Sequence, residues 1–125
     1  MKLNELTNNL RFILIKMSHK TKSPHLASSL SCIDIVGTLY QSVLKINKKN
    51  FKSSTRNRFI LSKGHAATAL YAALEYKKII SRKELNSYTK KGSFLEEHPS
   101  PKLSGVEAAT GSLGHGLSIG CGIAL

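Results

Sequence analysis

Four of the five histidines lie in segments with the composition of turns, where a side chain can reach a ligand. His25, His65, His98 and His115 each have a proline or glycine beside them, whereas His19 is at the end of a predicted helix. Neutral imidazoles donate and accept hydrogen bonds and protonated ones attract anions, so the four together favour polar contacts to a ligand. Taken singly, each has a surface or structural role as its simpler alternative. No HExxH, HxH or Cys-His spacing predicts a zinc site.

His65 follows a short apolar run and opens a predicted helix. Residues 58–61 (Arg-Phe-Ile-Leu) predict a strand, residues 62–65 (Ser-Lys-Gly-His) a tight turn, and the alanine-rich residues 66–76 a helix. Open α/β sheets bind ligands where a strand ends and a helix begins, and free backbone N–H groups there attract anions. The turn could therefore hold a phosphate, although it lacks the spacing of a P-loop. A tight turn with close helix packing explains its glycine as well as ligand contact does.

The remaining elements follow from apolar periodicity, capping residues and glycine content. Leucines at three- and four-residue steps predict an amphipathic first helix, and Ser81 with Glu84 forms a capping box. The long irregular segment after that box favours a functional loop. In chain order we expect a helix over 3–17 that ends near 18–22, a break over 23–29, a helix over 33–43, a strand over 58–61, helices over 66–76 and 81–88, a loop over 90–111, and a glycine turn with a helix over 111–125.

These elements predict an α/β fold that is mostly helical in this stretch, with one short strand near residues 58–61. A lone strand leaves its backbone groups unpaired, so further strands are expected from sequence outside these residues or from another chain. The last residues carry no C-cap signal and are typical of a helix interior. We expect one incomplete domain over residues 1–125.

Composition restricts the function classes. The 125 residues suffice for one domain, and 19 basic against 7 acidic side chains give a net charge of +12, with 41% hydrophobic residues. This hydrophobic content excludes a disordered polyelectrolyte. Cys32 and Cys121 are far apart and form no CxxC motif, which favours a reducing compartment. No export signal or membrane span is predicted, so we expect a soluble cytoplasmic protein.

Positive charge is concentrated in the first half of the chain, which raises an alternative function. Residues 45–58 contain six basic residues and no acidic one, with Phe51 among them and Phe59 directly after them. Phosphate attraction with aromatic stacking would make this a small basic module that binds a nucleic acid or another anion. No known nucleic-acid motif accompanies the cluster, and a solvated connector explains it as well.

Three ordered motifs resemble one enzyme family. They are residues 58–66 (Arg-Phe-Ile-Leu-Ser-Lys-Gly-His-Ala), 97–99 (Glu-His-Pro) and 105–117 (Gly-Val-Glu-Ala-Ala-Thr-Gly-Ser-Leu-Gly-His-Gly-Leu). In this order and at these distances they are similar to the start of transketolase, whose first domain is doubly wound and binds thiamine diphosphate. The resemblance extends from about residue 6 to residue 125, and it is closest to the short or split bacterial forms.

The resemblance implies roles for particular residues. His25 and His98 match histidines that face the donor ketose, and they are the expected catalytic residues. His65 matches the histidine that contacts the cofactor diphosphate, and Gly111 and Leu113 match residues that hold the cofactor rings. The full set of expected cofactor-binding residues is His65, Gly111, Ser112, Leu113 and His115. Since the family's reaction needs a carbanion at C2 of thiamine, imidazoles around the substrate hydroxyls can stabilise developing charge and move protons.

The resemblance also implies what the complete enzyme contains. The family enzyme transfers a two-carbon ketol unit between sugars, as a dimer with its active site at the subunit interface. Thiamine diphosphate is the implied cofactor, with Mg²⁺ or Ca²⁺ on its diphosphate. The metal-binding motif and the activating glutamate fall outside residues 1–125, so no metal ligand is expected here and the chain alone should be inactive. The expected partners are a phosphorylated or amino sugar and a C-terminal transketolase half or subunit, in a homodimer or heterotetramer, without nucleic acid or membrane.

The sequence departs from the family pattern at several positions. Residues 24–26 are Pro-His-Leu in place of the usual Gly-His-Pro, and Glu97 replaces a glycine. Ser112 replaces a common proline, and His115 stands where many members have glutamine. These changes surround the expected contacts, so substrate geometry is the feature that they affect most.

Overall fold

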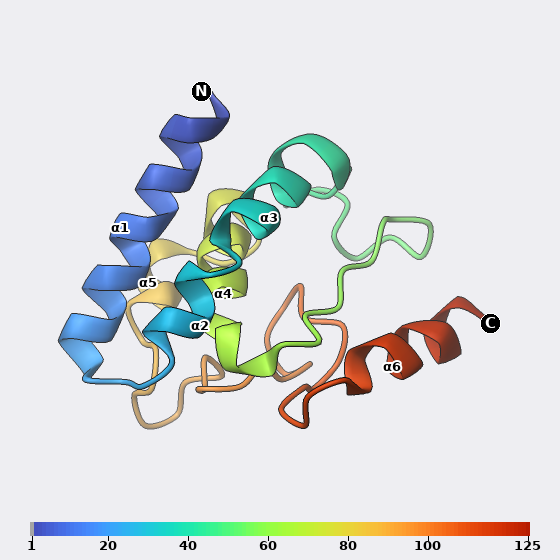
Figure 1. Ribbon diagram of the computed structural model, residues 1–125. Coiled ribbons are helices and arrows are strands. Elements are labelled where there is room, and N and C mark those ends of the chain that lie inside the picture. Colours follow the sequence, from blue (N-terminus) through green and yellow to red (C-terminus); the bar gives the residue numbers. More distant parts are fainter. Residues whose placement is uncertain (1) are drawn as a thin grey trace.

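The computed structural model describes residues 2–125 and is mostly helical over that range, with no strand (Figure 1). The helices are α1 (Leu3–Thr21), α2 (Leu26–Leu30), α3 (Ile33–Thr38), α4 (Ala67–Tyr76), α5 (Arg82–Leu85) and α6 (His115–Ala124), with a π-helical turn η1 (Leu39–Val43) after α3 and a 3₁₀ turn η2 (Gly64–Ala66) before α4. The helices predicted over 3–17, 33–43, 66–76, 81–88 and near the C-terminal end are therefore confirmed, with small differences at their ends.

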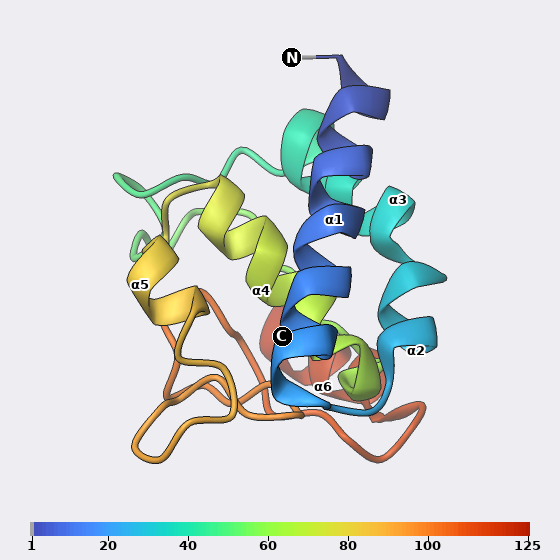
Figure 2. The ribbon, with the colours of Figure 1, turned by 90° about the vertical axis from the view of Figure 1, so that its left-hand side faces the viewer.

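The core forms where α1, α3 and α4 pack against one another (Figure 2). All residues of α4 from 67 to 75 are buried, and the small alanines among them allow neighbouring helices to approach closely. α1 contributes the apolar face read from the sequence, with Leu6, Leu10 and Leu14 almost fully buried. Each such side chain stabilises the fold by roughly 1.5–3 kcal/mol. We call α1 to α4 the helical bundle.

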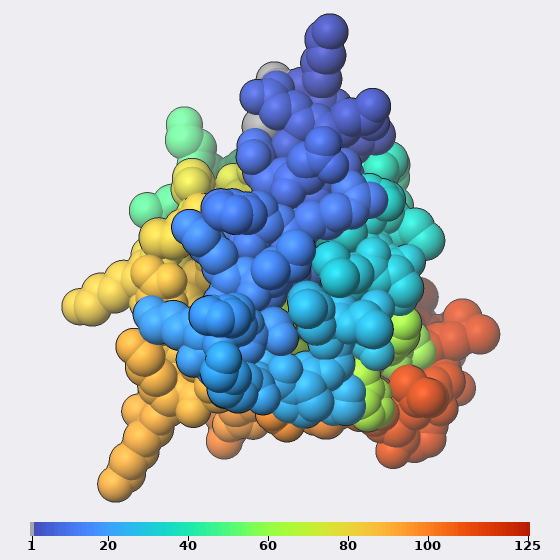
Figure 3. Space-filling view, turned by 60° about the vertical axis from the view of Figure 1, so that its left-hand side comes forward, coloured from blue at the N-terminus to red at the C-terminus, as the bar shows by residue number. Residues whose placement is uncertain are grey.

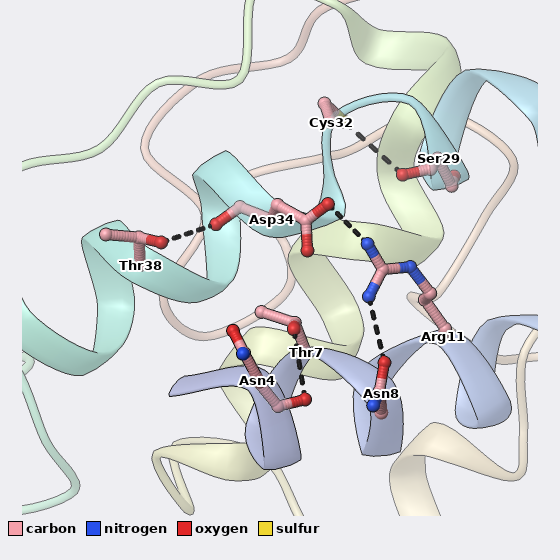
Figure 4. A network of polar contacts seen from close by, with 8 residues as sticks. All are labelled: Asn4, Thr7, Asn8, Arg11, Ser29, Cys32, Asp34 and Thr38. Carbon is pink, nitrogen blue, oxygen red and sulfur yellow. Dashed lines mark hydrogen bonds and ion pairs between the residues drawn. The ribbon is translucent and has the colours of Figure 1, made fainter. Parts of the chain in front are cut away.

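A polar network joins α1 and α3 at the surface of the helical bundle (Figure 4). The Arg11 guanidinium contacts the Asp34 carboxylate and donates to the Asn8 side chain at 3.2 Å. The Thr38 hydroxyl donates to the backbone carbonyl of Asp34 at 2.7 Å. Because the Arg11 and Asp34 side chains are 36% and 59% exposed, their ion pair contributes at most about 1 kcal/mol. The network orients the two helices, and apolar packing holds them together.

The prediction of a break over residues 23–29 is wrong from residue 26 onward, where α2 forms. It begins after His25, whose φ of 71° lies in the left-handed region. Ser29 is fully buried, and its hydroxyl shares a 2.7 Å hydrogen bond with the Thr68 hydroxyl on α4. This contact joins residues far apart in sequence, so the local composition of small polar residues gives no sign of it.

Residues 58–61 carry no regular secondary structure, so the predicted strand is wrong for this part of the chain. A strand needs a hydrogen-bonded neighbour, and no backbone–backbone hydrogen bond reaches these four residues from any other residue that the structure describes. Their side chains and carbonyls are used differently. Phe59 packs edge-on against Tyr40, with 5.3 Å between ring centroids, and the Leu61 carbonyl accepts a hydrogen bond from Thr110 Oγ1 at 2.7 Å.

The second part of the chain is less buried than the helical bundle. Residues 86–114 form a long irregular loop, which confirms the loop predicted over 90–111. The loop ends in α6, which lies beside the bundle and exposes Leu117 (Figure 1). The N–H of Gly116 in the first turn of α6 donates to the Ser62 hydroxyl at 3.1 Å. Between residues 2 and 125, no helix has the length and apolar content needed to cross a membrane.

Candidate functional site

Three histidine rings from separate parts of the chain meet beside the start of α4. His25 precedes α2, His65 lies in η2, and His98 lies in the long loop. The ring centroid of His65 is 4.7 Å from that of His25 and 4.6 Å from that of His98, and both pairs meet edge to face. The centroids of His25 and His98 are 6.2 Å apart. We call these three residues the histidine cluster.

The histidine cluster lies where α2, η2 and the long loop meet. In the space-filling view, the segment that leads into α4 reaches the surface between the cyan α2 region and the red C-terminal segment (Figure 3). His25 is exposed, whereas His65 and His98 are half-buried. A ligand can therefore reach the imidazoles from solvent without any opening of the core.

A lysine side chain fixes the turn before α4 onto the end of α2. Lys63 Nζ donates to the Ser28 carbonyl at 3.2 Å and to the Ser31 hydroxyl at 2.8 Å. These bonds join the segments that carry His25 and His65, so they help to hold the two rings in contact. Lys63 is consequently directed toward α2 and is not a free charge inside the turn.

The surroundings of His65 favour its neutral form. Partial burial lowers the pKa of His65, and charges on His98, His25 and Lys63 lower it further. A neutral imidazole can donate a hydrogen bond from one ring nitrogen and accept one at the other. An anion bound among the rings would have the opposite effect on the pKa, because a negative charge favours the protonated ring. His65 is therefore suited to take up a proton when an anion binds beside it.

A glycine allows the long loop to lie directly on the turn. A Cβ on Gly64 would be 2.3 Å from the Thr110 carbonyl oxygen, so no other residue fits at this position without movement of the loop. The Thr110 hydroxyl donates to the Leu61 carbonyl at 2.7 Å and fixes the same part of the loop from the other side. Next along the chain, Gly111 lies against the His98 ring, at 3.4 Å from the place where its Cβ would be.

A cavity of about 380 Å³ opens beside His98, which is within the roughly 300–1,000 Å³ typical of ligand pockets. Its lining residues are Glu96, His98, Pro99, Ser100, Ala109, Thr110, Gly111, Ser112 and His115. Two further cavities, of about 220 and 410 Å³, lie along α1 and have no histidine in their walls. The cavity beside His98 adjoins the histidine cluster, because His98 belongs to both.

Most of the predicted site residues lie together. The three histidines of the cluster touch one another, and Gly111 lies against His98. Ser112 and His115 line the cavity beside His98, although the His115 ring is not part of the cluster. Leu113 is 68% exposed and does not line this cavity. These placements concern position, and the roles assigned from the resemblance stay predictions.

Two further residues hold the site together without having been singled out in the sequence. The Thr110 hydroxyl joins the loop to the segment before the turn, as described above. Tyr71, in the middle of α4, donates from its hydroxyl to backbone carbonyls on both sides of Glu97. Their contribution depends on tertiary hydrogen bonds, for which residue type and spacing give no signal.

The basic stretch over residues 45–58 is partly neutralised by the loop. The Glu107 carboxylate, only 7% exposed, accepts hydrogen bonds from Arg56 at 2.5 Å and from Arg58 at 2.9 Å. Two of the six charges that favoured a nucleic-acid or anion-binding module are thus used in structural ion pairs. The alternative function has no support from the structure or from the relatives described next.

Comparison with known proteins defines a class and then a family. Transketolase from Leishmania mexicana shares the fold over 94% of this chain, with a TM-score of 0.85 and 26% sequence identity, and the match covers 18% of that protein. A family model described as transketolase, thiamine diphosphate binding domain, matches residues 3–125. The fold is therefore that of a thiamine-diphosphate-binding domain. The chain belongs to the transketolase family.

Curated relatives agree with this assignment. The chain is 39% identical over 112 residues to one subunit of apulose-4-phosphate transketolase from Phocaeicola vulgatus, a match that covers 90% of this chain and 40% of that subunit. It is 39% identical over 122 residues to transketolase-like protein 2 from Homo sapiens, covering 98% and 20%. The predicted family and the predicted fold class are confirmed. The chain spans less than half the length of these curated relatives.

Proposed function

We propose that this chain forms the first part of the cofactor-binding domain of a transketolase that transfers a two-carbon ketol unit between sugars. The histidine cluster is the observation that carries this proposal. The motifs at residues 58–66, 97–99 and 105–117 supply two of its three rings and the loop beside them. The three motifs, the histidine cluster and the cavity beside His98 therefore lie together at one edge of the molecule.

The residues present fit part of a thiamine diphosphate molecule. Partial burial and the charges of His98, His25 and Lys63 lower the pKa of His65, so an anionic diphosphate beside it would favour its protonated form. Gly111, Ser112 and His115 line an adjoining cavity that is large enough for a ring. We assign to Leu113 an apolar contact with the cofactor, because its side chain is 68% exposed and burial against a ring would stabilise it.

We assign His25 and His98 to the donor sugar. When bound, thiamine diphosphate supplies the carbon nucleophile that attacks the ketose carbonyl. His25 is exposed and His98 opens on the cavity, so their ring nitrogens can donate to the sugar hydroxyls or move a proton there.

Several parts of the proposed enzyme come from outside these residues. Within residues 2–125, no group of three or more His, Cys, Asp or Glu side chains is arranged to hold a metal ion. We infer that Mg²⁺ or Ca²⁺ takes its ligands from a later segment or a second subunit, and that residues 1–125 are one incomplete domain. The Phocaeicola vulgatus relative is named as a subunit, which supports a partner subunit here. We propose that the complete enzyme is a homodimer or heterotetramer and that it acts on a phosphorylated or amino sugar. We also propose a cytoplasmic location, which is compatible with two free cysteines.

Calorimetric titration of thiamine diphosphate with Mg²⁺ tests this function. The chain is titrated alone and together with whatever product is encoded immediately downstream, and we expect binding only in the mixture. His65→Ala should then weaken binding about tenfold or more, because the diphosphate loses an imidazole partner. His19→Ala is the matched control, because it removes an exposed imidazole in the last turn of α1 that is not part of the histidine cluster.

The other outcomes separate the alternatives. Binding by neither preparation, or equal weakening by both histidine variants, would contradict the proposed function. Tight binding by the chain alone would contradict the placement of the metal ligands outside these residues. If the chain bound an oligonucleotide with an affinity that falls steeply as salt rises, and bound no cofactor, the result would support the alternative function as a basic nucleic-acid-binding module.

A further inference from the structure

Tyr71 joins α4 to the part of the long loop that carries His98. Its hydroxyl donates to the carbonyl of Glu96 at 2.9 Å and to the carbonyl of His98 at 3.2 Å. A phenol has one proton, so the two carbonyls share it in a three-centre hydrogen bond. Both carbonyls must therefore face the same point on α4, which restricts the backbone on either side of residue 97.

The loop has few other ties at this point. No backbone–backbone hydrogen bond involves residues 96–99 in the part of the chain that the structure describes. Pro99 has no N–H to donate, and a proline restricts the residue before it to extended conformations. His98 therefore depends on a side chain from another element for its position.

Tyr71 is itself held firmly enough to serve as that anchor. It is fully buried in the middle of α4, and its ring packs edge-on against Tyr88 with 6.0 Å between centroids. Burial raises the pKa of Tyr71 well above its usual range, and the proximity of Tyr88 and Glu96 adds to this effect. The hydroxyl consequently stays protonated and able to donate across the ordinary pH range.

We propose that Tyr71 is a positioning residue of the site and that its hydroxyl holds the His98 imidazole against His65 and Gly111. The His98 ring centroid is 4.6 Å from that of His65, and the ring lies 3.4 Å from the place where a Gly111 Cβ would be. The contacts of His98 with His65 and with Gly111 both depend on the backbone of residues 96–98. Loss of the hydrogen bonds from Tyr71 to the Glu96 and His98 carbonyls would therefore separate the His98 ring from both partners. The catalytic meaning of this device rests on the proposed function, whereas the contact itself requires no cofactor.

Tyr71→Phe removes the hydroxyl and keeps the buried ring. Tyr88→Phe is the matched control, because it makes the same change in the partner ring, whose hydroxyl is not the donor to the Glu96 and His98 carbonyls. Both variants of the full chain are examined by NMR of isotope-labelled histidine side chains over a pH titration.

We expect Tyr71→Phe to abolish the NOE between the rings of His65 and His98 and to shift the His98 ring signals. The pKa of His65 should rise toward its ordinary value of 6.5, because the His98 charge moves away while His25 and Lys63 stay in place. The NOE between His25 and His65 should remain. Tyr88→Phe should leave the NOE between His65 and His98 and the His98 ring signals unchanged.

Unchanged ring contacts in a folded Tyr71→Phe chain would overturn the proposal, as would equal changes in both variants. If Tyr71→Phe does not fold, the wild-type chain decides the question. A slowly exchanging Tyr71 hydroxyl proton with NOEs to the Hα atoms of residues 96–98 supports the proposal, and its absence overturns it. None of these measurements uses the cofactor, so failure of thiamine diphosphate to bind would contradict the proposed function alone.

Discussion

The helical bundle and the segment of residues 86–125 are stabilised by different kinds of contact. In the bundle, side chains such as Leu14 and Leu70 are almost fully buried, and each apolar residue packs against several others. In residues 86–125, a few side chains (Tyr88, Leu95, Leu103 and Val106) join the same core, polar contacts such as the Thr110 hydrogen bond also fix the chain, and Leu113 and Leu117 stay exposed. The first region is therefore held mainly by apolar packing, and the second relies in addition on individual polar groups.

The candidate site lies on the boundary between these two regions. His25 and His65 belong to the bundle side, whereas His98 and Gly111 belong to the loop side. Segments with few buried apolar contacts open at a lower free energy than the core does. The bundle thus gives the site a fixed half, and the loop gives it a half that can adjust. Substitutions in the two regions should separate global stability from the geometry of the site.

The largest loss of stability is expected from a core leucine of the bundle. Leu70 is 2% exposed on α4, so Leu70→Ala leaves a cavity and should cost about 2–5 kcal/mol of unfolding free energy. Leu117→Ala, at a leucine that is 76% exposed on α6, should change it by less than about 0.5 kcal/mol. Urea unfolding followed by circular dichroism measures both. Equal losses would show that α6 is packed as firmly as the bundle.

The buried ion pair between Glu107 and Arg56 tests whether one polar contact can stabilise the fold nearly as much as a core leucine does. Glu107→Gln removes the charge that faces Arg56, whose side chain is 10% exposed, and should cost about 2–3 kcal/mol. Asp34→Asn breaks the exposed pair with Arg11 and should cost at most about 1 kcal/mol. The same urea experiment compares them. A smaller loss for Glu107→Gln than for Asp34→Asn would contradict the importance given to this contact.

Local patterns in the sequence were sufficient for the helices and insufficient wherever distant residues decide the structure. The leucine stripe of α1 and the capping box of Ser81 and Glu84 act within a few residues, and both form as predicted. α2 depends instead on the hydrogen bond between Ser29 and Thr68, and a strand over 58–61 would depend on a neighbouring strand. Neither partner can be recognised from the local residue pattern.

The candidate site shows the same division. The histidines were recognisable because they lie beside glycine or proline in segments with the composition of turns, and the resemblance to transketolases joined segments far apart in sequence. Tyr71 and Thr110 were not recognisable, since a tyrosine in an alanine-rich helix has the pattern of a core residue. Their role is visible only from the backbone carbonyls that accept hydrogen bonds from the Tyr71 and Thr110 hydroxyls. These bonds form only when the loop is folded.

A smaller effect, confined to the boundary, is expected from the glycine on which the loop lies. Gly64→Ala places a Cβ against the Thr110 carbonyl, so the loop must move, at a cost of about 1–2 kcal/mol. Gly122→Ala on α6 meets nothing within 4 Å and should be neutral or stabilise the helix by up to about 1 kcal/mol. Amide hydrogen exchange should show faster exchange in residues 96–111 for Gly64→Ala only. Unchanged exchange in that segment would mean that the close approach does not hold the loop.

The smallest effect is the pH dependence that the histidine cluster gives to stability. The pKa of His65 is lowered from 6.5 in the folded chain, so the unfolded chain binds its proton first. The stability that neutral His65 contributes is fully present above pH 6.5. It is lost as the pH falls from 6.5 toward the lower pKa that His65 has in the folded chain. The urea midpoint should therefore fall between about pH 7.5 and about pH 5.5, a range above the titration of ordinary carboxylates.

Two variants and one anion decide whether this pH dependence belongs to the site. His65→Ala should reduce the fall in the urea midpoint, whereas His19→Ala, which changes an exposed ring at the end of α1, should preserve it. Inorganic diphosphate should raise the midpoint more at the lower pH, since an anion favours the protonated imidazole. An undiminished fall in His65→Ala would place the pH sensitivity elsewhere. A diphosphate effect independent of pH would mean that the anion binds away from the boundary, and the adjustable loop would then have no part in holding it.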